Sequence, residues 1–104
     1  MPQTLIYVTA SSAEEATAIG RALVDERLAA CANILPGVTS IYRWEGALAE
    51  DSECALIAKT TTERTDALIA RVKALHSYDC PCIVALPITA GKPAFLEWIT
   101  TETA

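Results

Sequence analysis

Positive charge, histidine and long hydrophobic runs are all scarce in this sequence. Its 104 residues include 8 Lys or Arg, 13 Asp or Glu and 1 His, so the formal net charge is −5. Nucleic acids and anionic membrane surfaces attract proteins through Lys and Arg, so the acidic balance argues against both as partners. No uncharged stretch approaches the roughly 18 apolar residues of a membrane-spanning helix, and residues 1–8 lack the features of a signal peptide. We therefore expect a cytoplasmic protein.

Aromatic side chains are also scarce, at 6% of residues, whereas 52% of residues are hydrophobic. A chain of this length has room for one domain, so we expect residues 1–104 to form a single domain. The apolar fraction exceeds the usual ~45–50%, and a small monomer has limited interior in which to bury the excess. The composition therefore indicates an oligomer.

The apolar pattern predicts an α+β fold. The predicted elements are a strand at 5–8, a helix from 12 to about 29, hairpin arms at 31–45 and 53–60, a helix ending near 75, a strand at 83–88 and a short helix after 91–93. Ser12 to Glu15 and Thr60 to Glu63 match the capping-box pattern at helix starts, and Pro36 marks a bulge or an edge. This order predicts a ferredoxin-like βαββαβ sandwich with a long central hairpin and a short C-terminal helix.

The predicted strands are apolar on both faces, but the two main helices can cover only one face. The hairpin is also long for a small domain, and Tyr42 and Trp44 lie at its far end. Large aromatic side chains in such a place are typical of interface anchors. We therefore expect another subunit to supply the missing cover.

Features of an enzyme are few. His76 is the single histidine, so any Cys–His or Ser–His pair must use it, and no third orienting group is evident. No two of the four glycines lie within six residues, and no G-K-[ST] sequence is present, so a phosphate-binding loop is absent. We expect neither catalysis nor an organic cofactor.

The densest set of metal-ligand types lies at residues 76–82, where His76, Asp79, Cys80 and Cys82 fall within seven residues. Thiolate and imidazole suit copper or zinc, so we predict a Cu or Zn site from these four side chains. Cys-x-Cys spans a metal poorly unless a turn or a neighbouring subunit helps. In the alternative interpretation the thiols pack at a strand start and His76 sits as a cation at a helix C-terminus.

The other cysteines and the acidic residues of the hairpin have simpler interpretations. Cys31 and Cys54 lie in apolar strand contexts, and we expect both to fill the core. The hairpin also carries a cluster of acidic residues. Most clusters of this kind are solvated and discourage strand pairing at a sheet edge. A weak divalent-cation site is the alternative interpretation. The members of the cluster are Glu45, Glu50, Asp51 and Glu53.

Several segments together resemble the CutA divalent-cation-tolerance family. They are 8–10, 26–42, 44–46, 59–60 and 76–81, and the similarity extends from Tyr7 to Ile99. The resemblance implies a ferredoxin-like subunit in a homotrimer related to PII signalling proteins, with the long hairpins paired to neighbouring subunits. It also implies a role in tolerance of copper and other divalent metals, and for eukaryotic relatives a link to acetylcholinesterase anchoring.

The sequence departs from the family pattern at the predicted metal site. Relatives usually read His-Pro-Tyr-Glu-x-Pro-Glu where residues 76–82 read His-Ser-Tyr-Asp-Cys-Pro-Cys. Cys82 thus exchanges a hard carboxylate for a soft thiol. Some relatives also carry a cysteine, considered a copper ligand, where Val8 stands here.

Three functions remain open from the sequence. The first is a trimer that binds metal ions without enzymatic turnover. The second is a PII-like sensor that holds a small molecule in clefts between subunits, lined by Tyr42, Trp44, Lys59 and Tyr78. The third is a structural or anchoring trimer.

Overall fold

Four strands form one antiparallel sheet in the order β2-β3-β1-β4 in the computed structural model, which describes residues 2–104. The elements in chain order are β1 (Gln3–Ala10), α1 (Ala13–Asp25), β2 (Cys31–Trp44), β3 (Ala47–Thr61), the 3-10 turn η1 (Thr62–Arg64), α2 (Thr65–Leu75), β4 (Ile83–Pro87) and α3 (Pro93–Glu102). The α+β class and the βαββαβ order are thus as predicted. Residue 1, which the single-domain prediction includes, lies outside the described residues.

Helix α1 begins as predicted but ends earlier. The Ser12 hydroxyl accepts a hydrogen bond from the Glu15 backbone N–H at 3.1 Å, as a helix N-cap does. The predicted end near residue 29 is wrong, because Arg27 adopts a left-handed conformation with φ of 58°. The backbone N–H groups of Leu28 and Ala29 then turn back to the carbonyl of Leu23, which closes the helix.

The second predicted capping box is wrong. Thr60 lies in β3 and is fully buried, and its hydroxyl donates to the Leu28 carbonyl at 2.7 Å. Helix α2 begins five residues later at Thr65, after η1, and neither start has a side-chain cap. The threonine therefore ties the end of β3 to the turn after α1.

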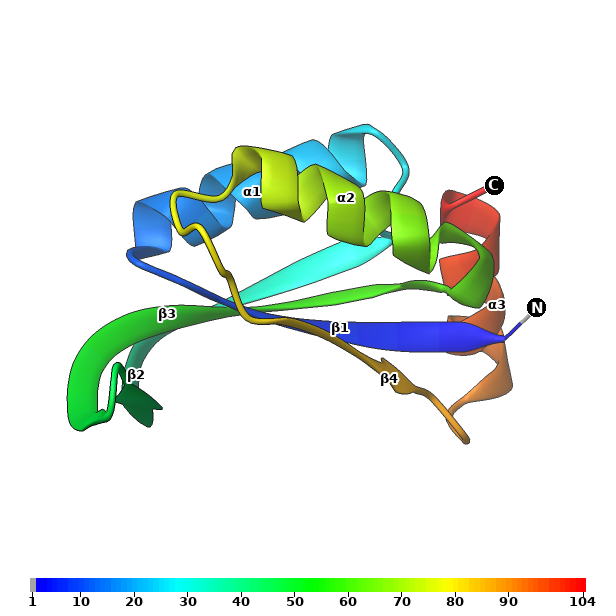
Figure 1. The fold of residues 1–104 in the computed structure, drawn as a ribbon. Coiled ribbons are helices and arrows are strands. Elements are labelled where there is room, and N and C mark those ends of the chain that lie inside the picture. Colours follow the sequence, from blue (N-terminus) through cyan, green and yellow to red (C-terminus); the bar gives the residue numbers. More distant parts are fainter. Residues whose placement is uncertain (1) are drawn as a thin grey trace.

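The hairpin is longer and its turn tighter than predicted. Glu45 and Gly46 alone connect the arms, with φ of 49° and 79°, as in a two-residue turn. Residues 50–52, expected at a turn, belong to β3, where Ser52 pairs with Thr39. The bulge predicted at Pro36 is confirmed, because the register shifts between Leu35 and Val38. Beyond the bulge the hairpin curves away from the helices (Figure 1) and brings the longest extent of the molecule to 44 Å.

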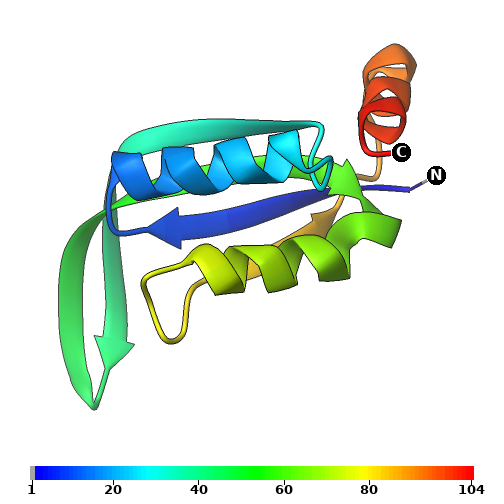
Figure 2. The ribbon, with the colours of Figure 1, turned by 90° about the horizontal axis from the view of Figure 1, so that it is seen from above.

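Helices α1 and α2 lie side by side over one face of the sheet, which we call the covered face (Figures 1 and 2). The core between them is apolar, and its main side chains are at most 2% exposed: Ile6, Val8, Ile19, Leu23, Leu56, Ala58, Leu68 and Val72. Burial of each large side chain in this set stabilises the fold by about 1.5–3 kcal/mol. None of the helices in residues 2–104 is long and apolar enough to cross a membrane.

In the part of the chain that the structure describes, no helix covers the opposite face of the sheet, which we call the open face. Strand register defines it by two rows of side chains: Cys31, Lys59, Leu5 and Leu86, then Asn33, Ile57, Tyr7 and Val84. The side chains of Val84 and Leu86 are 47% and 48% exposed. The predicted shortage of cover is therefore confirmed for the single chain.

Helix α3 lies at the end of the sheet near both termini (Figure 1). Of the large apolar side chains Phe95, Trp98 and Ile99 on this helix, only Ile99 is buried, whereas Phe95 and Trp98 are 43% and 39% exposed. Their two rings lie 5.4 Å apart and form a second apolar patch that the chain itself leaves open.

Candidate functional site

Residues 76–82 form a connector between α2 and β4, and this connector is the candidate site. It lies where β1 enters α1 and where the hairpin leaves the body of the protein (Figure 2). Hydrogen bonds fix it to three elements that are distant in sequence, namely β1, α1 and β3. The connector therefore has a defined position on the fold.

The imidazole of His76 is fully buried and uses both ring nitrogens. Its Nδ1 accepts a hydrogen bond from the Tyr78 backbone N–H at 3.1 Å, so Nε2 carries the proton and donates to the Thr9 carbonyl at 2.8 Å. Nδ1 also lies 3.9 Å from Oε2 of Glu15, and the alternative of a cationic His76 at the helix end stays a prediction. Metal binding by His76 would have to break one of these hydrogen bonds.

Glu15 joins the start of α1 to the connector. Its Oε1 accepts from the Ser11 backbone N–H and hydroxyl at 3.0 and 2.8 Å, and its Oε2 accepts from the Ser77 backbone N–H at 2.7 Å. Burial alone would raise the pKa of this carboxyl, but the hydrogen bonds from Ser11 and Ser77 outweigh it and lower the pKa from 4.5 to about 2. The carboxylate is therefore charged at neutral pH. The sequence predicted Glu15 only as part of a capping box.

Two tyrosines donate to carboxylates of the hairpin. The hydroxyl of Tyr78 donates to Glu53 at 2.8 Å, and burial together with this bond raises the pKa of Tyr78 to about 12. The hydroxyl of Tyr42 donates to Asp51, and this bond is the main reason that its pKa is raised. Two members of the predicted acidic cluster are thus hydrogen-bonded.

The four cysteines occupy different environments. Cys54 is buried, which confirms the core prediction, but Cys31 is half-buried, with its Sγ 3.8 Å from Lys59 Nζ on the open face. Cys80 and Cys82 are both exposed, so they do not pack into the interior of this chain. Within residues 2–104 all four are free thiols.

The predicted ligands are not gathered around one point within a single chain. No group of three or more His, Cys, Asp and Glu side chains in residues 2–104 is placed to share a metal ion. Among the four predicted ligands, His76 is held in the interior, whereas Asp79, Cys80 and Cys82 are exposed. The four-residue metal site remains a prediction.

The four residues of the predicted cleft also lie apart. Tyr42 and Trp44 are on the hairpin, and Tyr78 contacts the same hairpin through Glu53. Lys59 lies six residues farther along β3, roughly 20 Å away for extended chain, and its Nζ donates to Asn33 Oδ1 at 2.6 Å. A cleft with all four residues needs more than one subunit and remains a prediction.

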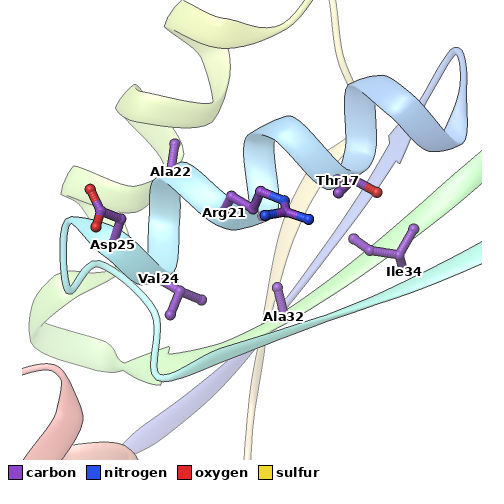
Figure 3. A pocket seen from close by; sticks show the side chains of 8 residues that line it. Thr17, Arg21, Ala22, Val24, Asp25, Ala32 and Ile34 are labelled. Carbon is purple, nitrogen blue, oxygen red and sulfur yellow. The ribbon is translucent and has the colours of Figure 1, made fainter.

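A shallow groove of about 730 Å³ runs between α1 and β2 (Figure 3). Its lining includes Arg21, Val24, Ala32 and Ile34 but none of the connector residues. The sequence feature that accompanies this groove is Gly20, which lets α1 approach β2 closely. A Cβ atom at position 20 would lie only 3.2 Å from the Cβ atom of Ala32. The groove is where the helix approaches the edge strand, and its lining contains no His, Cys or other predicted site residue.

Comparisons with known proteins agree over nearly the whole chain. The family described as "CutA1 divalent ion tolerance protein" matches residues 4–102. A divalent-cation tolerance protein CutA from Thermus thermophilus is 52% identical over 101 residues, which are 97% of this chain and 98% of that protein. A chloroplastic protein CutA from Arabidopsis thaliana is 43% identical over 99% of this chain, which spans 57% of that relative.

The fold also matches solved structures of such proteins. The Thermus thermophilus structure gives a TM-score of 0.95 at 51% identity and covers 98% of this chain and 99% of that one. A structure described as the periplasmic divalent cation tolerance protein CutA from Archaeoglobus fulgidus gives a TM-score of 0.94 at 43% identity, with 98% and 99% coverage.

Proposed function

The chain belongs to the CutA1 divalent ion tolerance family, and on that premise we propose that it is a homotrimer that binds copper or a similar metal ion without chemical turnover. In this role it contributes to tolerance of the metal. The observation that carries the proposal is the anchored connector, which exposes Asp79, Cys80 and Cys82 together on a family fold.

Assembly is supported by the open face. Stable obligate interfaces bury about 2,000 Å² or more and resemble a protein core in composition. The open face carries Leu5, Tyr7, Ile57, Val84 and Leu86, which is the composition that such an interface uses. Light scattering at micromolar concentration should give three times 11.1 kDa. A stable species of 11.1 kDa under these conditions would contradict the trimer.

Metal binding is tested on protein purified without added metal. We expect titration with Zn(II) or Cu(II) to saturate at a fixed ratio to the chain, with the secondary structure unchanged. Mg(II) should not compete, because thiolates prefer softer ions. Absence of saturable binding of either ion by the intact trimer would overturn the proposed function.

We place the protein in the cytoplasm, as the sequence predicts. A reducing compartment would keep Cys80 and Cys82 as the free thiols that metal binding needs. Relatives carry the words chloroplastic and periplasmic in their names, so the compartment varies within the family. Cell fractionation with an antibody to this chain tests the location, and recovery in another compartment would contradict it.

A further inference from the structure

Cys80 and Cys82 differ from the other two cysteines because both are exposed and only Pro81 separates them. Consecutive Cα atoms are about 3.8 Å apart, so the two Cα atoms lie within about 7.6 Å of one another. Metal–thiolate bonds of about 2.3 Å allow one ion to bridge two sulfurs up to about 4.6 Å apart. The chain bends at residues 77–80, up to the pair, and two cysteine side chains on Cα atoms at this separation can reach that sulfur spacing across a turn.

The chain on both sides of the pair is already fixed. On one side, Ser77 is bonded to Glu15, and the Tyr78 hydroxyl is bonded to Glu53. On the other side, Ile83 pairs with Val8 at the start of β4. Pro81 restricts the backbone between the thiols. A ligand that binds there does not have to order a flexible loop, which favours affinity.

The ligand set determines the class of ion. His76 is buried with both ring nitrogens bonded, and no three metal-binding side chains converge among the described residues. Zn(II) prefers four ligands in a tetrahedron, whereas the soft ion Cu(I) is favoured by thiolates and is satisfied by as few as two of them. We propose that Cys80 and Cys82 of one chain form a two-thiolate site for Cu(I) that does not include His76.

This inference rests on the proposed function in metal binding and names the ion that the connector takes. Binding involves no electron transfer: two thiols release two protons, and two sulfur–copper bonds form on one Cu(I). Asp79 has a hard carboxylate and stays outside the coordination sphere.

The test is an anaerobic competition titration of the reduced, intact protein with Cu(I) and a chromophoric Cu(I) chelator. We expect one Cu(I) per chain. Cys82→Ser should weaken binding at least ~10-fold and Cys80→Ser/Cys82→Ser at least ~100-fold, whereas Cys31→Ser, which removes a thiol elsewhere on the sheet, should stay within ~2-fold of the parent. Circular dichroism and light scattering verify that each variant keeps the fold and the assembly.

X-ray absorption of the loaded protein supplies the second readout. Two sulfur scatterers without imidazole nitrogen are expected, and a nitrogen shell would overturn the exclusion of His76. Unchanged Cu(I) affinity in the double variant would overturn the site. In that case the proposed function would still stand if Zn(II) or Cu(II) saturates the trimer, so the two failures are distinguishable.

Discussion

The two faces of the sheet use alternate residues of the same strands, yet they end in different environments. On the covered face, Ile6, Val8 and Leu56 are 0% exposed beneath α1 and α2. On the open face, Val84 and Leu86 are 47% and 48% exposed, although they are equally apolar. The chain therefore supplies cover for one face and leaves the other face open. The covered face thus stabilises the fold of the single chain, and the open face is the surface that we propose for assembly.

The largest effect should come from a charge on the open face. Leu86→Asp places a carboxylate opposite Leu5, where a subunit interface would leave it buried and unpaired at a cost of several kcal/mol. Light scattering should show a shift from the trimer toward 11.1 kDa. Ala70→Asp, on the exposed side of α2, is the control and should leave the mass unchanged. If Leu86→Asp keeps the parent mass, the open face is not the interface.

The covered face should respond through folding. Leu56→Ala removes a fully buried side chain and should lower the free energy of unfolding by about 2–5 kcal/mol. Urea denaturation at one fixed protein concentration measures the change. Leu75→Ala, at the exposed end of α2, is the control and should lower it by less than about 1 kcal/mol. Equal losses in the two variants would contradict the assignment of the core.

The hydrogen bonds that Glu15 accepts also stabilise the covered side, and their contribution to stability depends on pH. The pKa of Glu15 is about 2 in the folded chain and 4.5 without these contacts, so its contribution is complete above pH 4.5 and is lost as the pH falls toward 2. Glu15→Gln should lower the free energy of unfolding at pH 7 by about 2 kcal/mol.

Urea denaturation at several pH values tests this. The difference between the parent and Glu15→Gln should shrink between pH 4.5 and 2, whereas Glu14→Gln, in the exposed first turn of α1, should behave like the parent. A difference that stays constant over this range would show that the Glu15 charge is not responsible.

The smallest effect should come from dilution alone. If the open face is buried by association, a hundredfold dilution lowers the melting temperature by a few degrees, because the unfolded chain is monomeric. Differential scanning fluorimetry of reversible transitions measures it. A melting temperature that is independent of concentration would mean that the covered face alone stabilises the chain.

The sequence predicted the covered face well because its signal is local. Ile19 and Leu23 recur at helical spacing in one helix, as Leu68 and Val72 do in the other, and these side chains form the core. The errors occurred where a local pattern competed with a distant contact. Thr60 fits a capping box, but the carbonyl of Leu28, 32 residues away, holds it in β3.

For the candidate site, the sequence identified the connector but not the roles within it. The hydrogen bond between His76 and Thr9 spans 67 residues, and that between Ser77 and Glu15 spans 62. Such contacts exist only after the sheet has formed, so the residue types could suggest ligands but could not show that His76 is already bonded. The exposure of Cys80 and Cys82 depends on the same tertiary placement.

The pairing of β1 with β4 has a consequence for the order of folding. It joins residues 4–8 to 83–87, whereas the hairpin closes through the two-residue turn at Glu45 and Gly46. Short-range pairing of this kind forms in about 1–10 μs, and contacts of long sequence separation form more slowly. During synthesis the residues of the hairpin leave the ribosome before those of β4. Until residues 83–87 pair with β1, that edge of the sheet is open, and pairing with another copy competes with closure of the chain's own fold.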